Sequence, residues 1–197
     1  DAFDHPGSAE VMPWNASAAP LCDPSFLSGL GPELTHLLAP HLERLQTVSL
    51  PKLRTLRRQV IHNDMHPGNI LLSNAGEISG IIDFGDAIKA PLIQDLAVSS
   101  TSLVEAVPHA PTEPLRDLIE GFISAYPLDD SELALLHDAM ILRSILSVVL
   151  GRVKDHTVPP RDRPRPATAA SETGLRAILT LRLPAPRPAP SRGYANE

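Results

Sequence analysis

Residues 62–69, which read His-Asn-Asp-Met-His-Pro-Gly-Asn, place a carboxylate and an amide in one polar loop. Asp64 and Asn69 lie five positions apart, and the Pro-Gly pair between them favours a turn. Asp83 lies fourteen positions after Asn69, at the end of an apolar run, and the Phe-Gly pair behind it favours another sharp turn. Because rigid scaffolds present reactive groups on loops at strand ends, we expect Asp64, Asn69 and Asp83 to converge at the edge of a small sheet.

Three converging oxygen-bearing side chains of this kind are suited to phosphoryl transfer. Magnesium binds one or two carboxylates together with the phosphates of a substrate. The reaction needs one carboxylate that orients the attacking hydroxyl and accepts its proton, and an amide and a second carboxylate that hold the metal. The loop residues and Asp83 supply this set of groups.

The elements that must position these loops are short strands. β-branched and apolar residues predict strands at 59–62, 69–72 and 78–84, with a turn at 73–76 between the last two. Ahead of them, residues 1–32 read as a loop with one short helix around Trp14. A leucine stripe from Glu33 predicts a helix that Pro40 should kink or split, and Ser49 should cap a second short helix.

Helices are also predicted after the strands. The first spans about 94–107, and the second runs from a cap at Thr112 to about Tyr126. Asp129 and Glu132 have the spacing of a capping box, which starts a helix that runs to about Val153. This last helix is apolar on most sides and is therefore expected to be central and buried.

The motifs resemble those of a known group of enzymes. The Asp64/Asn69 spacing followed by Asp83-Phe-Gly is similar to the catalytic and metal loops of protein-kinase-like enzymes, although Asn63 stands where protein kinases have arginine. The wider stretch resembles the aminoglycoside phosphotransferase family, which includes aminoglycoside, choline, homoserine and hydroxylysine kinases. The flanking residues 57–64 and 82–86 are most similar to the hydroxylysine-kinase-like branch.

The resemblance implies an α+β fold: a mostly helical C-terminal lobe of a protein-kinase-like fold over residues 1–157, with a small β-hairpin or sheet carrying the catalytic and metal loops. It also implies a reaction in which the γ-phosphoryl group of ATP or GTP moves, with Mg²⁺, to a hydroxyl of a small molecule. Hydroxylysine, choline-like and aminoglycoside-like alcohols are the expected acceptors, because residues 1–157 carry a net charge of −10 that would attract a cation.

Residue roles are also implied by the resemblance. Asp64 matches the catalytic base, and Asn69 and Asp83 match the ligands of the metal and nucleotide. Asp95 matches an aspartate that braces the catalytic loop from the following helix. The remaining candidates for a substrate-binding or loop-bracing role are His62, whose part is mainly architectural, His66 and Asp86.

An N-terminal lobe of antiparallel strands, with a lysine and a glutamate that hold the triphosphate, is not recognisable in the sequence. Nothing before Glu33 is strand-rich, and no lysine precedes Lys52. The chain is therefore expected to be a fragment that is inactive alone, and a truncated, catalytically silent lobe with a binding or regulatory role is the alternative. A protein kinase is disfavoured, because only eleven residues separate Asp83 from Asp95 and Ala-Pro-Glu is absent.

Composition and charge exclude several classes of function. The chain has 197 residues, of which 43% are hydrophobic and 20% charged, with a net charge of −6. The acidic balance argues against nucleic-acid binding. The sequence contains no run of about 18 apolar residues, so no membrane-spanning helix is expected. A single cysteine, Cys22, excludes an intrachain disulfide and favours a cytoplasmic setting. Residues 158–197 form a Pro/Arg-rich tail of net charge +4 with one helix expected at 171–183. The oligomeric state is left open.

Overall fold

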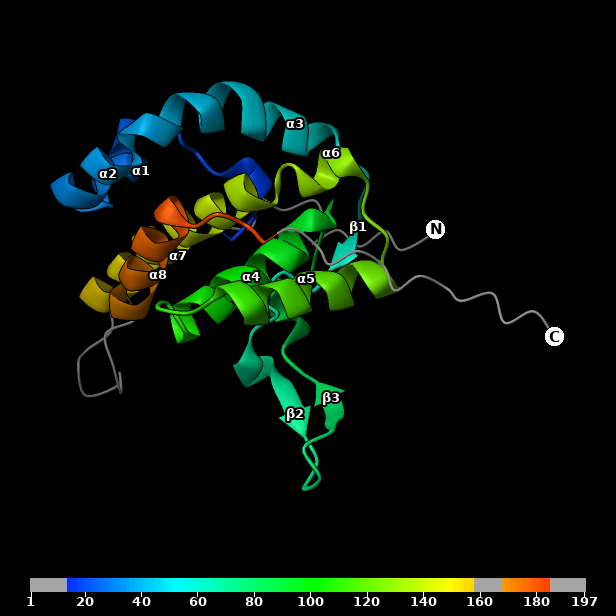
Figure 1. Cartoon of the computed structure of the whole chain (residues 1–197). Coiled ribbons are helices and arrows are strands. Elements are labelled where there is room, and N and C mark those ends of the chain that lie inside the picture. Colours follow the sequence, from blue (N-terminus) through cyan, green and yellow to red (C-terminus); the bar gives the residue numbers. More distant parts are fainter. Residues whose placement is uncertain (1–13, 158–167, 185–197) are drawn as a thin grey trace.

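The computed structural model describes residues 14–157 and 168–184. Figure 1 shows helices α2 and α3 arching over one side, α4, α7 and α8 in the middle, and a β-hairpin projecting from the opposite side. The predicted α+β class is confirmed, since two small antiparallel ladders accompany a mostly helical chain. The helices are α1 (Pro24–Ser28), α2 (Gly31–Arg44), α3 (Leu50–Thr55), α4 (Ile93–Ala106), α5 (Thr112–Ala125), α6 (Asp130–Leu133), α7 (Leu136–Thr157) and α8 (Thr168–Thr180).

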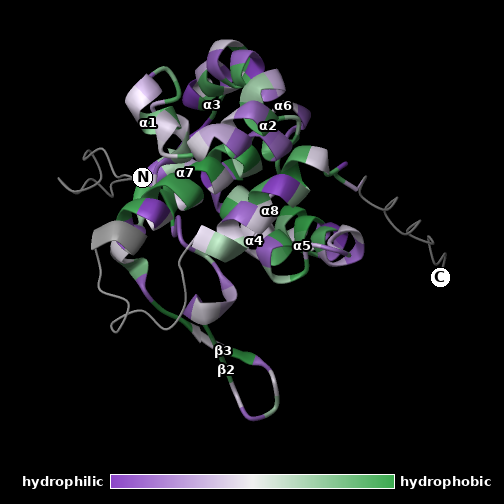
Figure 2. Cartoon of the chain, turned by 90° about the vertical axis from the view of Figure 1, so that its left-hand side faces the viewer, coloured by the Kyte–Doolittle hydropathy of each residue, from purple (hydrophilic) through white to green (hydrophobic). Residues whose placement is uncertain are grey.

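Helix α7 forms the centre of the core, as its apolar sequence predicts. Leu136, Met140, Ile141 and Ile145 are buried on it, and α4 and α8 pack against it. Figure 2 shows hydrophobic segments, in green, on these helices, and apolar residues of all three belong to one buried core. The predicted single helix over 129–153 is in fact divided into α6 and α7. Helix α8 begins and ends three residues before the predicted bounds, and packs on the same core.

Of the kink or split expected at Pro40, the split is wrong. Helix α2 continues through Pro40 to Arg44, and a π-helical turn, Leu45–Ser49, joins it to α3. Burial of Leu38 and Leu45 on either side of the proline offsets its missing hydrogen bond.

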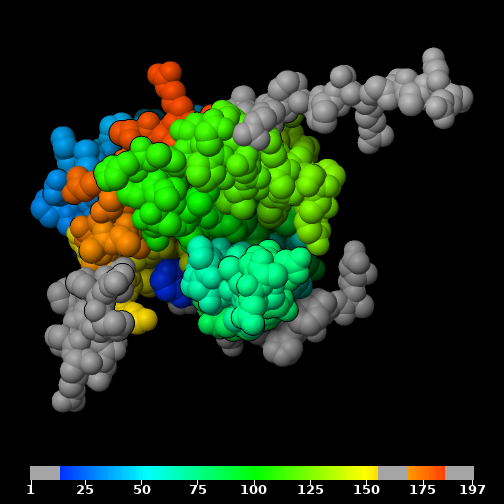
Figure 3. Space-filling model, turned by 60° about the horizontal axis from the view of Figure 1, so that its bottom comes forward, coloured from blue at the N-terminus to red at the C-terminus, as the bar shows by residue number. Residues whose placement is uncertain are grey.

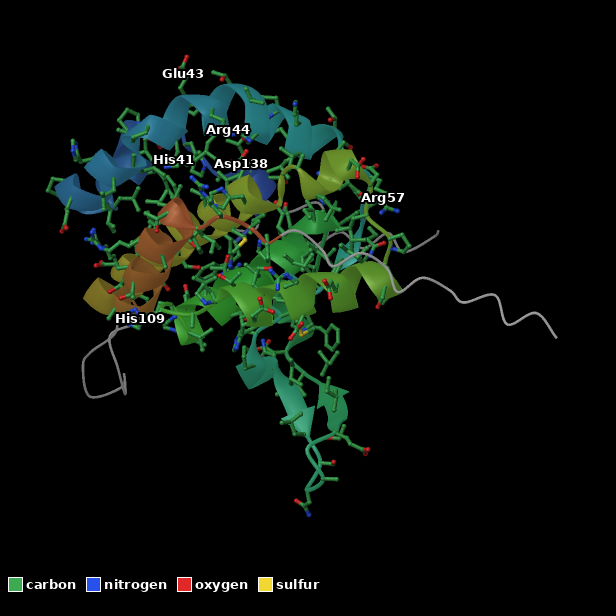
Figure 4. All side chains as sticks on the ribbon, viewed as in Figure 1. His41, Glu43, Arg44, Arg57, His109 and Asp138 are labelled. Atoms are coloured by element: carbon green, nitrogen blue, oxygen red, sulfur yellow. The ribbon has the colours of Figure 1, made fainter. Side chains whose placement is uncertain are left out.

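The expected cap at Ser49 is also wrong. Ser49 is helical and its hydroxyl donates instead to Asp138 Oδ2 of α7, at 2.6 Å. Arg44 donates to the same carboxylate from α2, at 2.9 Å from Nη2, and the two labelled side chains meet in Figure 4. The hydroxyl therefore links α7 to the helical segment before α3 and does not cap the start of α3.

Four strands form two separate ladders where a single small sheet was expected. Strand β1 (Arg58–Ile61) pairs antiparallel with β4 (Ile88–Pro91), which the sequence pattern did not reveal. Strand β2 (Ile70–Leu72) pairs with β3 (Ile78–Ile81) as the predicted hairpin, although β3 ends before Asp83. The 3₁₀ turns are Ala16–Ala18, Pro67–Asn69 and Phe84–Asp86.

The two predicted caps after the strands have different outcomes. Thr112 is the first residue of α5 and makes no capping hydrogen bond, so that prediction is wrong. The capping box of Asp129 and Glu132 is confirmed at the start of α6. Arg57, labelled in Figure 4, donates to Glu132 at 2.7 Å, which fastens the chain just ahead of β1 to this helix.

Among the described helices, none combines the length and the apolar character needed to cross a bilayer.

Candidate active site

Asp95, in the first turn of α4, holds the loop that contains Asp64. Its carboxylate accepts the backbone N–H groups of His62, at 3.1 Å, and of Asn63, at 2.7 Å. Asn63 has a φ of 65°, a left-handed conformation that asparagine tolerates better than most residues. Burial raises the pKa of Asp95, and the two backbone hydrogen bonds oppose that shift. The loop is thus fixed to α4 through a partly buried carboxylate.

His62 links the two reactive loops. Its Nδ1 accepts the N–H of Asp64 at 3.3 Å, and its Nε2 donates to the carbonyl of Ile82 at 3.0 Å. The neutral tautomer with the proton on Nε2 satisfies both contacts. The ring also packs on Phe84, with 4.7 Å between centroids. His62 therefore sets the spacing between Asp64 and the residue that precedes Asp83.

Asn69 and Asp83 are carried by neighbouring backbone segments, and both have side-chain oxygens that could bind a metal. Asn69 Nδ2 donates to the carbonyl of Asp64 at 2.9 Å, which leaves its Oδ1 as the oxygen available to a metal. Ile82 donates its N–H to the carbonyl of Asn69 at 3.0 Å, and Asp83 follows with φ 62° and an exposed side chain. One amide oxygen and one carboxylate fit Mg²⁺ that takes its remaining ligands from phosphates and water. Within the described residues, no group of three or more His, Cys, Asp or Glu side chains could hold a metal by itself.

Arg143 of α7 is a site residue that the sequence analysis did not identify. Its Nη2 donates to Asp64 Oδ1 at 2.9 Å and its Nη1 to the carbonyl of Asn63 at 3.3 Å. The guanidinium lies 4.8 Å from the centroid of the Trp14 ring. Burial lowers the pKa of Arg143, and the charge of Asp64 opposes that shift. The usable signal was a single arginine inside the apolar stretch 141–150, since a buried charge requires a partner.

The other two candidates lie beside Asp64. His66 Nδ1 accepts the N–H of Gly68, and its Nε2 is 3.5 Å from Asp64 Oδ2. Asp86 has a raised pKa, first because of burial and then because of the negative charge of Asp64, while Arg143 opposes the shift. The structure therefore brings all of the sequence-predicted site residues into one region between β1, the hairpin and α4.

A cavity of about 480 Å³ opens beside Asp64. Its lining comes from the catalytic loop, α4, α7 and α8, and from Trp14 near the start of the described chain. Figure 3 shows this side of the molecule, where the first described residues, in blue, lie between the hairpin and the end of α7. The lining residues used below are Asp64, Thr101, Glu105, Arg143, Lys154 and Ser171.

Comparison with known proteins agrees with this geometry. Residues 6–132 match the model of the phosphotransferase enzyme family, and this range contains the catalytic loop, the hairpin and Asp95. A hydroxylysine kinase from Xenopus laevis is 26% identical over 181 residues. The match covers 85% of this chain and 46% of the relative, so the chain spans about half the length of that protein. With well over half of its residues inside the family match, the chain belongs to the phosphotransferase enzyme family.

Proposed function

We propose that this chain carries the acceptor-binding and metal-binding half of a small-molecule kinase, in which Asp64 is the catalytic base. The observation that carries the proposal is that Asp64 lines the cavity, while Asn69 is hydrogen-bonded to Asp64 and to Ile82, the residue before Asp83. The two oxygens of Asp64 are unequal. Oδ1 is held by Arg143 at 2.9 Å, whereas the contacts of Oδ2 with Asn69 and His66 are longer, at 3.3 and 3.5 Å.

This inequality supports Oδ2 of Asp64 as the proton-accepting atom. An alcohol in the cavity would donate its proton to Oδ2, because Oδ1 is engaged by the arginine. The alcohol oxygen would then attack the γ-phosphorus of ATP or GTP as the bond to the β-phosphate oxygen breaks. Asn69 Oδ1 and the carboxylate of Asp83 would hold Mg²⁺, which when bound neutralises charge on the triphosphate.

The proposed acceptor is a small molecule with an amine and a hydroxyl. A second carboxylate, that of Glu105, lines the cavity with Asp64, and negative charge favours a cationic ligand. The similarity to a hydroxylysine kinase supports an amine-bearing alcohol, and the hydroxylysine-kinase-like branch stays a prediction.

The test is phosphoryl transfer from labelled ATP or GTP to a panel of cationic alcohols, neutral sugars and a serine peptide. It is run on the chain and on any longer gene product that contains it. In the active form, Asp64→Asn should lower turnover about 10²- to 10⁴-fold with little change in acceptor binding, as expected for loss of a general base. Asp83→Asn should weaken Mg²⁺ and nucleotide binding instead, and the exposed Glu43→Gln should change neither. Near-normal turnover by Asp64→Asn, or transfer to neutral sugars alone, would contradict the proposal.

We also infer that the chain by itself transfers phosphate slowly. The described strands form only two two-stranded ladders, and the match covers less than half of the related kinase. Positioning supplies most of the catalysis in phosphoryl transfer, so an unclamped triphosphate reacts poorly. Turnover by the chain alone at about 1 per second or faster, a rate typical of complete enzymes, would overturn this inference.

A further inference from the structure

We propose that Glu105 and Thr101 of α4 form a subsite for a primary ammonium group in the cavity beside Asp64. The proposal rests on the proposed function for the place of the reacting hydroxyl, which lies at Asp64. It adds which residues recognise the other end of the acceptor and which kind of amine they select.

The first support is two unpartnered polar atoms. Within the described residues, five buried side-chain nitrogen or oxygen atoms have no hydrogen-bond partner, and two belong to residues that line this cavity: Thr101 Oγ1 and Glu105 Oε1. These residues are four positions apart on α4, so their side chains lie on the same face one turn from each other. Both oxygens are shielded from solvent, so a ligand would reach them after a small side-chain rotation. Because an unpaired buried carboxylate oxygen is costly, a cation that made this contact would be favoured.

The second support is the way α8 holds the Glu105 side chain. A Cβ placed on Gly174 would lie 2.5 Å from Glu105 Cγ, so the backbone of α8 presses directly on the stem of the glutamate. Ser171 of α8 also lines the cavity, and its hydroxyl is a hydrogen-bonding neighbour of the Glu105 carboxyl. The carboxylate is thus kept at the cavity by a neighbouring helix, and is not free to turn into solvent.

The donor and acceptor inventory selects a primary amine. A primary ammonium has three N–H donors and one positive charge, which match a carboxylate oxygen and a hydroxyl oxygen. A quaternary ammonium has no donor and is recognised by the faces of aromatic rings. In this lining Trp14 already has the Arg143 guanidinium on its ring, at 4.8 Å from the centroid.

The positive charges of Arg143 and His66 in the cavity lining act on Glu105, but the salt bridges found among the described residues do not include Glu105. Arg143 is paired with Asp64 at 2.9 Å. Lys154 lines the cavity from α7 and has interactions of its own. Its positive charge in the same cavity is compatible with an acceptor that also carries a carboxylate, such as a hydroxylated amino acid.

The test is an NMR titration of the chain with ethanolamine, choline and 5-hydroxylysine. Ethanolamine and choline differ only in methylation of the nitrogen, and hydroxylysine adds an amino-acid carboxylate. We expect ethanolamine and hydroxylysine to bind, and choline to bind at least about 10-fold more weakly. Glu105→Gln should weaken ethanolamine about 10- to 100-fold, the size expected for one charge-assisted hydrogen bond. Thr101→Val should weaken it a few-fold, and Glu43→Gln, on the outside of α2, should have no effect.

Gly174→Ala provides an independent perturbation, because it keeps the carboxylate but pushes it from its place. It should weaken ethanolamine binding although the side chains of Thr101 and Glu105 are chemically the same as in the unmodified chain. Equal affinity for ethanolamine and choline, unchanged binding by Glu105→Gln, or no saturable binding of any primary amine would overturn the subsite. The comparison of the two amines uses the unmodified chain, so it decides the question even where a variant folds poorly.

The outcomes separate this subsite from the proposed function. If primary amines bind through Glu105 but no alcohol is phosphorylated, the proposed function fails and the subsite stands. If cationic alcohols are phosphorylated with the same KM in Glu105→Gln as in the unmodified protein, the function stands and the subsite fails.

Discussion

Replacing Asp95 with alanine tests whether one partly buried carboxylate fixes the loop of residues 62–69. The substitution leaves the N–H groups of His62 and Asn63, now bound at 3.1 and 2.7 Å, without an acceptor. An unsatisfied buried donor costs about 1–3 kcal/mol, so two cost about 2–6 kcal/mol. Burial raises the pKa of Asp95, which means that the charged side chain itself costs free energy when folded, and alanine removes that cost. We therefore expect a net loss near the lower half of the range, about 2–4 kcal/mol.

The measurements are thermal unfolding and amide hydrogen exchange of residues 62–69. For a domain of this size, about 1 kcal/mol shifts Tm by roughly 2–4 °C, so Asp95→Ala should lower Tm by roughly 4–16 °C. Asp95→Asn keeps one acceptor oxygen for one of the two backbone N–H groups, while its NH₂ faces the other N–H. The loss of stability should therefore be about half as large as for Asp95→Ala. Glu43→Gln is the control, with an expected change within about 0.5 kcal/mol. A Tm for Asp95→Ala within about 2 °C of the unmodified chain, or exchange in the loop that is no faster, would refute the reasoning.

Three further predictions concern stability. Asp138→Ala should lower the free energy of unfolding in urea by about 1–3 kcal/mol, because it removes the acceptor of Ser49 and of the half-exposed Arg44. An unchanged urea midpoint would show that these contacts of Asp138 contribute nothing to stability. Asn63→Gly should be tolerated, since glycine adopts φ 65° freely and the substitution removes the buried, unpartnered Nδ2. Asn63→Val should lower the free energy of unfolding by about 1–3 kcal/mol. Equal stability of the two variants would argue against the left-handed conformation of residue 63. Burial raises the pKa of Glu105 above the ordinary value of 4.5. The contribution of Glu105 to folding stability is therefore fully present below pH 4.5, and it is lost as pH rises through the raised pKa. Glu105→Gln should therefore gain stability relative to the unmodified chain as pH rises above about 4.5. Chemical unfolding of both proteins at several pH values measures this difference. The reverse trend would contradict the burial of Glu105.

Much of the site was predictable because its chemistry is local in sequence. Asp64 and Asn69 lie on one loop, and the hairpin that follows returns the chain to Asp83, so strand pairing alone brings the three together. The buried face of α7 was predictable for a similar reason, since an apolar pattern of helical period needs only neighbouring residues to be recognised. The capping box of α6 is likewise a pattern of four consecutive residues.

Other features depend on contacts that no local pattern encodes. Arg143 and Asp64 are 79 positions apart, and only the packing of α7 under the catalytic loop brings the guanidinium to the carboxylate. Ser49 has the sequence position of a cap, yet the chain before it is already helical, so no helix begins there, and its hydroxyl donates to Asp138 of another helix. Strand β4 has four residues, and its pairing with β1 across thirty positions identifies it as a strand.

By itself, therefore, the sequence determined the family motif, the hairpin and the helical core, because each depends on residue types at short, regular spacing. The tertiary structure alone decided that Arg143 pairs with Asp64 and that Oδ2 of Asp64 has the longer contacts. It also decided that Glu105 reaches the cavity, because Gly174 on α8 allows two helices to meet at the glutamate stem. The physical reason is that burial and pairing energies depend on three-dimensional neighbours, which a chain acquires only when its distant segments pack.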